Sequence, residues 1–225
     1  MYKYDIHVHT SETSCCGLMS AAETVERYRA SGYTGLCFTD HYSSSTFERA
    51  SGSWRDKADR FLSGYRAAKK VADGLDILLG AELHFGRPGE HIYSSNDYLV
   101  YGITEEFIYA YPELHLLTLP EFSEIAKKHD LLVIQAHPMR NNMELVHLDL
   151  LDGMEVYNGN QNHEARNEKA EAFARARGYI LTSGSDCHEE KHVGRGGILC
   201  SRRLSSSADL KALLRSGDYK LIKTI

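Results

Sequence analysis

Short runs of apolar, β-branched and aromatic residues recur along the chain, separated by more polar stretches. Runs of this length without polar alternation are typical of strands that are buried on both faces. The runs cover residues 4–8, 35–39, 77–81, 98–103, 131–135, 153–157 and 179–183. We therefore expect seven buried strands.

Most of the intervening segments carry apolar residues at helical spacing. These segments cover residues 20–31, 61–72, 119–129 and 165–177, and a last short helix is expected to begin over 210–214. Ser20 and Glu23 form a capping-box signature at the first of them. Each segment is therefore expected to form a helix between two strands.

Strand–helix alternation through seven strands implies parallel pairing with right-handed crossovers. A closed or nearly closed (β/α) barrel accommodates this pattern, and a doubly wound open sheet is the alternative. No internal repeat or Pro/Gly/Ser-rich linker divides the chain, so we expect a single domain over residues 1–225.

Composition restricts the cellular compartment of the protein more than it restricts its activity. A formal net charge of −5 gives no electrostatic footprint for nucleic acid, although a local basic patch could still exist. No apolar run has the length of a signal peptide or a membrane span. The five cysteines are odd in number and two are adjacent, which does not fit a disulfide framework. We expect a cytoplasmic protein with reduced thiols and no membrane partner.

Twelve histidines are scattered along the chain, and several lie with carboxylates where a predicted strand ends. Asp97 is the exception, because it begins the fourth strand. In an α/β barrel the carboxyl ends of the strands meet on one face, where active sites form. We expect these side chains to share one cleft: His7, His9, Asp40, His41, Glu82, Asp97, His137, Asp186 and His188.

The spacing of these residues favours metal binding. His7 and His9 are two residues apart on a strand, so both imidazoles point to the same side, and Asp186 and His188 have the same spacing. Imidazole and carboxylate ligands together suit zinc, manganese or iron. The ligands outnumber the four that one tetrahedral zinc needs, so a multinuclear site with a bridging carboxylate is expected. Such a site activates water without a Ser or Cys nucleophile.

Five motifs resemble, in order, those of the polymerase and histidinol phosphatase (PHP) family of metal-dependent phosphoesterases. They are Asp5-Ile-His7-Val-His9-Thr10, Thr39-Asp40-His41, Gly80-Ala-Glu82, Ala136-His137-Pro138 and Ser185-Asp186-Cys-His188. The resemblance covers about residues 4–195 and implies an α/β fold, a distorted (β/α)7 TIM-like barrel with two or three divalent ions. It also implies hydrolysis of a phosphate ester, with a metal-bridging hydroxide as nucleophile.

The resemblance also implies roles for individual ligands. It assigns His7, His9, Glu82 and Asp186 to the first ion. Glu82 would bridge to a second ion that also takes His137. The third ion would take the remaining two histidines, His41 and His188.

Two departures from the family pattern affect this ligand set. The family often supplies an Asp or His soon after the first motif, where this chain offers Glu12, Cys15 or Cys16. The family commonly has a His at the fourth strand, where this chain has Asp97, with His91 as the alternative.

Further residues near the strand ends are candidates for substrate contacts. Arg140 could hold a phosphate bidentately or face solvent. Arg195, in a glycine-rich segment, and Arg87 have the same two alternatives. Asn158 could orient substrate or a bound water, or simply form a turn. Asp186 and His188 are the candidate residues for moving protons.

We therefore expect a metal-dependent phosphoesterase that acts on a small phosphomonoester. Nucleotides and short oligonucleotides are alternative substrates within the range that the family resemblance implies. Hydrolysis of a carbon–nitrogen bond by an amidohydrolase-type site, and a non-catalytic metal-stabilised binding domain, are the rival hypotheses. The sequence leaves the oligomeric state open.

Overall fold

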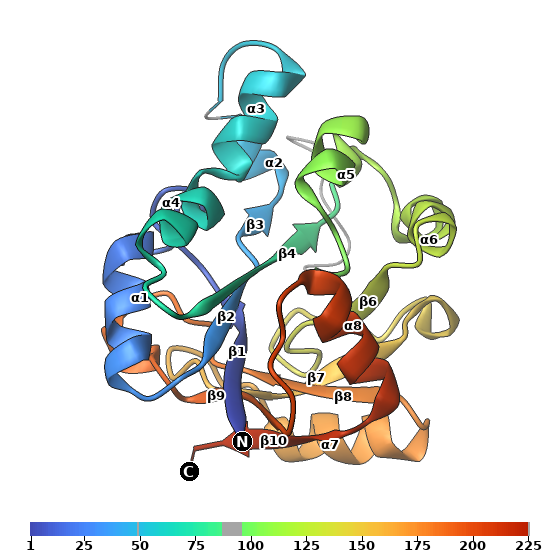
Figure 1. Cartoon of the computed structure of the whole chain (residues 1–225). Helices are drawn as coiled ribbons and strands as arrows, with labels where there is room; N and C mark the ends of the chain where they lie inside the picture. Colours follow the sequence, from blue (N-terminus) through green and yellow to red (C-terminus); the bar gives the residue numbers. More distant parts are fainter. Residues whose placement is uncertain (49, 87–95, 225) are drawn as a thin grey trace.

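The apolar runs form strands that curl into a nearly closed barrel (Figure 1). The computed structural model describes residues 1–48, 50–86 and 96–224. The seven expected strands are β1 (Tyr2–Val8), β2 (Gly35–Phe38), β4 (Asp76–His84), β5 (Asp97–Tyr101), β6 (Leu132–Gln135), β7 (Gly153–Asn158) and β8 (Ile180–Gly184). The expected TIM-like barrel is confirmed, and the alternative of an open doubly wound sheet is wrong.

The sheet runs in the order β10-β9-β1-β2-β4-β5-β6-β7-β8. The barrel closes between β8 and β1, where Cys187, just past β8, pairs in parallel with Val8. The backbone N–H of His9 donates to the carbonyl of Cys187 at 3.0 Å, and that of Cys187 donates to the carbonyl of His7 at 3.2 Å. Two strands that the apolar pattern did not predict, β9 (Gly196–Cys200) and β10 (Tyr219–Lys223), add an antiparallel pair beside β1.

The strand–helix alternation had predicted parallel pairing throughout, but one of the expected strands runs antiparallel to its neighbours. β5 runs antiparallel to both β4 and β6, while the neighbouring pairs β2–β4 and β6–β7 are parallel. The segment between β4 and β5 lacks the helical pattern that a crossover to a parallel neighbour needs. The reversal places Asp97, the first residue of β5, at the edge where the parallel strands end.

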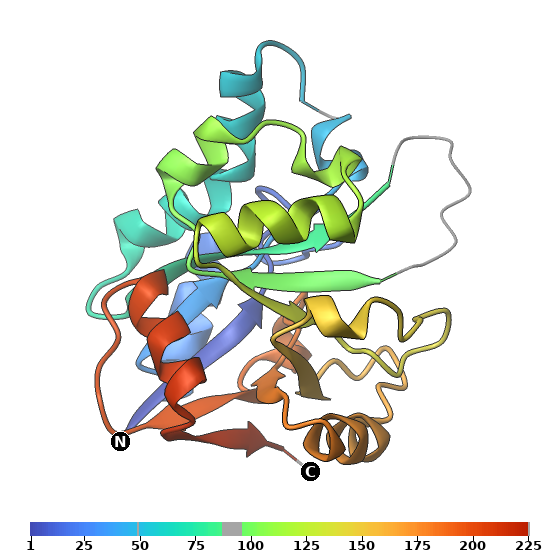
Figure 2. The same ribbon diagram turned by 90° about the vertical axis from the view of Figure 1, so that its right-hand side faces the viewer.

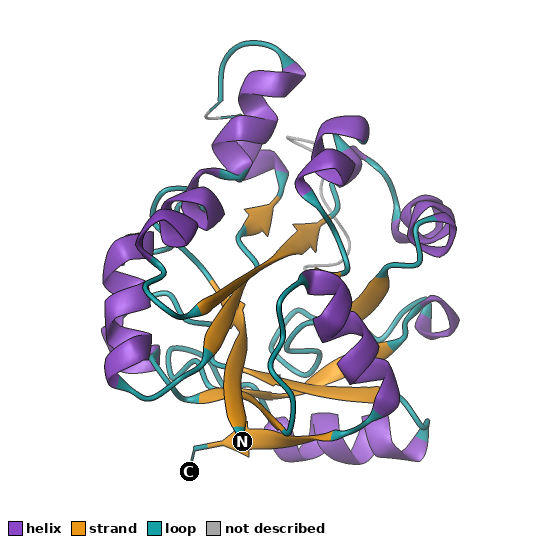
Figure 3. Cartoon of the chain, in the orientation of Figure 1, coloured by secondary structure: helices purple, strands orange, loops and turns teal. Residues whose placement is uncertain are grey.

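The expected helices form and lie outside the strands (Figure 3). They are α1 (Ala21–Ala30), α4 (Ser63–Val71), α6 (Leu119–Lys128), α7 (Asn167–Ala176) and α8 (Ser207–Ser216). The capping box of Ser20 and Glu23 is present at α1. The helix expected over 61–72 is α4, which begins two residues later, because residue 61 is the last residue of a separate helix, α3 (Trp54–Phe61).

Three short elements between β2 and β6 were also not predicted: β3 (His41–Tyr42), α2 (Ser44–Phe47) and α5 (Glu105–Ala110). With α3 and α6 they cover one side of the barrel (Figure 2). They are too short to display a clear apolar period, so neither type of pattern marks them.

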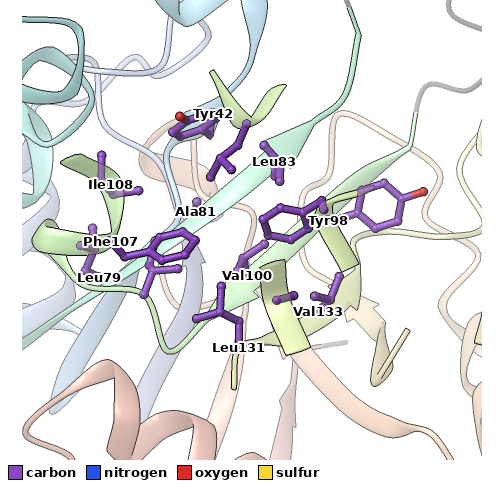
Figure 4. Close-up of a cluster of buried hydrophobic side chains, with 14 of the residues drawn as sticks. Tyr42, Leu79, Ala81, Leu83, Tyr98, Val100, Phe107, Ile108, Leu131 and Val133 are labelled. Atoms are coloured by element: carbon purple, nitrogen blue, oxygen red, sulfur yellow. The ribbon is translucent and has the colours of Figure 1, made fainter. Parts of the chain in front are cut away.

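Strand alternation in β4 separates the core from the site. Leu79, Ala81 and Leu83 point to one face, where they pack with Phe107 and Ile108 of α5 (Figure 4). Glu82 shares the opposite face with Leu78, because side-chain direction repeats every two residues. The apolar cluster thus holds β4 in a register that turns Glu82 into the barrel mouth. Within the described residues, no helix has the length and apolar character to cross a membrane.

Candidate metal centre

The end of β1 brings two buried imidazoles against two carboxylates. His7 Nε2 lies 3.3 Å from Glu82 Oε1 and 3.4 Å from Asp186 Oδ1. His9 Nε2 lies 3.2 Å from Glu82 Oε2 and 3.3 Å from Asp186 Oδ1. All four side chains are at most 2% exposed. Four side chains from three remote segments of the chain therefore converge on one point.

Glu82 lies at the centre of a wider set of histidines. Its Oε1 is 3.0 Å from His137 Nε2, and its Oε2 is 3.1 Å from His41 Nδ1. His41 reaches it because β3 pairs in parallel with β4, with His41 directly opposite Glu82. Burial alone would raise the pKa of Glu82, but His7 and His41 hold it well below its usual value. The carboxylate is therefore ionised and available to more than one cation.

The side chains form three groups whose nitrogen and oxygen atoms lie within 4.8 Å of one another. The first group is His7, His9, Glu82 and Asp186; the second is Glu82, Asp97 and His137; the third is His9, His41 and His188. Glu82 is shared by the first two groups and His9 by the first and third. All eight residues predicted as ligands thus come together, in groups that correspond to the three expected sites.

Hydrogen bonds on the side away from Glu82 and Asp186 orient the imidazoles of His7 and His9. His7 Nδ1 lies 2.8 Å from Glu155 Oε1, so the neutral imidazole carries its proton on Nδ1. His9 Nδ1 lies 3.3 Å from Ser14 Oγ, which gives its own proton to Asp40 Oδ1 at 2.7 Å. When both rings are neutral, as ligation of an ion requires, each directs an Nε2 lone pair toward the carboxylates.

The atoms that face one another at this point have no hydrogen-bond partner. They are His7 Nε2, His9 Nε2, Glu82 Oε2 and Asp186 Oδ1, and all are buried. An unpartnered buried polar atom costs about 1–3 kcal/mol. Although burial opposes charge, Asp186 and Glu82 raise the pKa of His9 to about 9. The cluster therefore attracts positive charge, and this donor set fits a divalent ion that displaces protons on binding.

The chain adopts an uncommon backbone conformation at two of these residues. His137 has φ of +30° and Asp186 has φ of +50°. The left-handed region costs a residue with a side chain about 1–2 kcal/mol. Such conformations persist where the surroundings hold them and cluster at functional sites.

Asp186 divides its two carboxylate oxygens between different partners. Oδ2 accepts hydrogen bonds from Arg140 Nη2 at 2.6 Å and Asn158 Nδ2 at 3.3 Å. Oδ1 is left to face His7 and His9. Burial would raise the pKa of Asp186, but His7, His9 and Arg140 hold it well below its usual value. One oxygen is thus anchored while the other is available to an ion.

Asp97 and His188 complete the second and third groups. Asp97 Oδ1 lies 2.8 Å from His84 Nδ1, and its Oδ2 lies 3.8 Å from His137 Nε2. His188 Nδ1 lies 2.9 Å from the Asp186 carbonyl, which leaves Nε2 for an ion. Burial, together with His9, lowers the pKa of His188 to about 3. His188 is therefore neutral near pH 7 and suited to ligation.

Glu12, Cys15 and Cys16 were the alternatives for the ligand that the family often has soon after the first motif, and they lie in different places. Glu12 accepts the backbone N–H of Ala21 at 3.0 Å and so caps α1. Cys16 lines the cleft beside His41 and His188, whereas Cys15 is not among the cleft-lining residues of the described chain. His91 and Arg87 lie outside the described residues.

The groups open into a cleft of about 280 Å³. Its described lining comprises Cys16, Leu18, His41, Glu82, Asp97, His137, Arg140, Asn160, Asn162, His163, Asp186, His188 and Glu189. Arg140 therefore reaches the cleft, but two other expected substrate contacts do not. Asn158 is buried beneath it, against Glu155 and Asp186. Arg195 packs its backbone against Gly159, close enough that a Cβ on the glycine would meet it at 2.8 Å.

Two buried carboxylates lie behind the histidines: Glu155, to which the sequence assigned no role, and Asp40, which was expected to share the cleft but is not among its described lining residues. Glu155 contacts His7, and Asp40 accepts hydrogen bonds from Thr10 and Ser14. Glu155 is the only charged residue of its apolar strand. An unpaired carboxylate in such a strand is costly, so its presence was a signal that a partner lay nearby.

A profile of the PHP domain matches residues 5–208. The chain belongs to the PHP domain family. This PHP chain is thus a member of a family of metal-dependent hydrolases, as its motifs had indicated. Comparison with curated protein sequences gives no significant match.

Solved structures share the fold of this PHP chain at low sequence identity. PsfC from Pseudomonas syringae is 15% identical with a TM-score of 0.70, over 100% of this chain and 93% of that one. A candidate metal-dependent phosphoesterase from Bifidobacterium adolescentis is 17% identical with a TM-score of 0.54, over 94% and 95% of the two chains. A lesion-specific endonuclease from Pyrococcus furiosus is 15% identical with a TM-score of 0.62, over 98% of this chain and 57% of that one.

Proposed function

We propose that this PHP chain hydrolyses a small phosphomonoester with the help of two or three divalent ions. The observation that carries the proposal is the convergence of three ligand groups that share Glu82 and His9. A single tetrahedral ion would use only four of these eight side chains. Two or more ions explain why so many ligands meet at one barrel mouth.

The first ion would take His7, His9, Glu82 and Asp186. The second would share Glu82 and take Asp97 and His137, and the third would take His41 and His188 beside His9. Zinc, manganese and iron all suit imidazole and carboxylate ligands. Ions bound here would supply an activated water at neutral pH and neutralise the charge of the phosphoryl oxygens.

The chain's own residues would position the ester. Arg140 lines the cleft, and its Nη2 is committed to Asp186 and Asn158. A guanidinium carries five N–H donors, so Arg140 retains others for a phosphate oxygen. Arg140 holds Asp186 in place, and His188 lies beside Asp186. We propose these residues as the phosphate contact and the proton-moving pair.

The cleft favours a small substrate. Its volume of about 280 Å³ is at the lower end of the range for small-molecule sites. Among the described residues, Glu82, Asp97, Asp186 and Glu189 line it, against one arginine. A polyanion such as duplex DNA would find little complementary charge here. A nucleotide or short oligonucleotide is the alternative substrate, and one structural neighbour is a DNA endonuclease.

We also propose that the protein works in the reducing environment of the cytoplasm. All five cysteines are free, and Cys37, Cys187 and Cys200 are buried as thiols. Structural disulfides are rare in that compartment.

The test is to strip the protein of metal, reload it with Mn²⁺, Zn²⁺ or Fe²⁺, and measure product release from a substrate panel. The panel contains phosphomonoesters, phosphodiesters, dinucleotides, single-stranded DNA and amides. We expect metal-dependent phosphate release, fastest with small monoesters and lost in Asp186→Asn. Turnover of amides alone would support the amidohydrolase alternative. Metal binding without turnover of any substrate would support the hypothesis of a non-catalytic metal-stabilised binding domain.

A further inference from the structure

We propose that Glu155 is a positioning residue that holds one ligand of each of two ion sites and thereby couples their metal affinities. The inference rests on the proposed metal centre and concerns a residue outside the ligand set. Glu155 lies on β7, behind the histidines as seen from Glu82. It is 1% exposed, so its charge is shielded from solvent.

Three donors converge on the Glu155 carboxylate. Oε1 accepts the Nδ1 proton of His7 at 2.8 Å. Oε2 accepts the backbone N–H of His137 at 3.0 Å and Nδ2 of Asn158 at 2.8 Å. Both oxygens are therefore engaged, and each one reaches a different candidate ligand.

The two histidines belong to different ion sites. His7 is in the first group and His137 in the second, and they share only Glu82 on the ion side. His7 Nε2 and His137 Nε2 lie 3.3 Å and 3.0 Å from the same oxygen of Glu82. Glu155 joins the same two residues from the opposite side. The two histidines are thus held between two carboxylates, one that faces the ions and one that does not.

The bond to His7 acts on its imidazole. A carboxylate that accepts the outer N–H of a ligating histidine fixes its tautomer and ring orientation and makes the other nitrogen more basic. The bond to His137 acts on the backbone instead. The φ of His137 is +30°, and the Glu155 contact helps to hold the chain in this strained conformation. One residue therefore prepares a ligand for each site by two different means.

Gly184 of β8 provides independent support. A Cβ on Gly184 would lie 2.3 Å from the Cβ of His7 and 2.8 Å from Oε1 of Glu155. No side chain fits at that distance without displacing one of them. β8 therefore has a glycine where a larger residue would separate His7 from Glu155, although the φ of Gly184 is not among the positive values.

The decisive variant is Glu155→Gln, which keeps the shape and removes the charge. A glutamine has one oxygen and one NH₂ group, so at least one of the three donors must face another donor. We expect the affinities of the first and second sites to fall together, by about 10- to 100-fold. Asp152→Asn is the matched control, because Asp152 precedes the same strand and accepts the N–H of Val133. Its metal affinities are expected to equal those of the wild type.

The measurement uses Zn²⁺ alone, without an ester, by competition with a chromophoric chelator and by metal content after dialysis. Circular dichroism of the metal-free proteins checks that each variant folds. If Glu155→Gln does not fold, Gly184→Ala replaces it, with the same joint loss expected. Unchanged affinities, or a loss at one site only, would overturn the coupling. A wild type that binds zinc but hydrolyses no ester would refute the proposed function and leave this result intact.

Discussion

Arg140 and Asp186 form an ion pair at the wall of the cleft, with Nη2 2.6 Å from Oδ2. The arginine side chain is 12% exposed and the aspartate 2%, so little solvent screens the pair. Asp186 uses its other oxygen to face His7 and His9. The residue that the sequence suggested as a phosphate contact therefore also holds a candidate metal ligand in place.

Because Arg140 contacts Asp186 and also lines the cleft, Arg140→Gln is expected to change both metal affinity and substrate binding. Loss of the guanidinium leaves a buried carboxylate without its partner, so we expect metal affinity to fall. Loss of the cation at the cleft should also raise KM for a phosphomonoester, and together kcat/KM should fall by about 100-fold. Chelator competition and steady-state kinetics separate the two effects. A raised KM with unchanged metal affinity would confine Arg140 to substrate binding.

Ser14 offers a test of how His9 is oriented. Its Oγ donates to Asp40 and contacts both His9 Nδ1 and the backbone N–H of His41. We expect Ser14→Ala to reduce the free energy of unfolding by about 1–2 kcal/mol, because buried partners are left unsatisfied. Zinc affinity should fall by about 10-fold.

Ser123→Ala is the control for Ser14→Ala. Ser123 is also buried, but its hydroxyl donates to the carbonyl of Pro120 within α6, away from the cleft. Chemical denaturation and zinc titration of both variants make the comparison. Equal zinc affinities in the two variants would refute the orienting role of Ser14.

The convergence of the candidate ligands could be predicted because it depends on local rules. His7 and His9 lie two apart on a strand, and strand ends meet on one face of a barrel. Glu82 could be recognised as a candidate because it is a carboxylate directly after an apolar run. Each of these features depends on a few neighbouring residues, so it can be recognised from the sequence alone.

The supporting contacts depend on neighbours that are remote in the chain. Arg195 and Asn158 follow the same local rules as Arg140, yet only Arg140 lines the cleft. The backbone of Arg195 packs against Gly159, and Asn158 donates a hydrogen bond to Asp186 beneath the cleft. The reversed direction of β5 likewise follows from pairing with β4 and β6. A pair of side chains separated by 18 or more residues, such as Arg140 and Asn158, leaves no periodic pattern in a single sequence.

Removal of metal is expected to destabilise the fold measurably. The groups around Glu82 and Asp186 would lose the cation that satisfies their buried atoms. Zinc at 100 times its Kd would add about 2.7 kcal/mol per site, which corresponds to a rise in Tm of about 5–10 °C for a chain of this size. Differential scanning calorimetry of stripped and reloaded protein measures the change. Asp186→Asn should show a smaller rise, and an equal rise would place the ion elsewhere.

His115 should contribute a pH dependence of stability that is separate from the metal centre. Its side chain is buried and stacks on Phe47 with ring centroids 4.8 Å apart. Burial, together with Lys57, lowers the pKa of His115 to about 4, whereas an unfolded histidine titrates near 6.5. The unfolded state therefore binds the proton first. The contribution is fully present above about pH 6.5 and is lost as the pH falls toward 4.

The matched variant is His115→Phe, which keeps an aromatic ring in the same apolar surroundings but does not titrate. Between pH 7 and pH 4 we expect the wild type to lose up to about 3 kcal/mol more stability than the variant. Urea denaturation of the two metal-free proteins at each pH gives this difference, because groups common to both cancel. Parallel curves would mean that the folded protein binds a proton at His115 as readily as the unfolded chain does, which would refute the prediction.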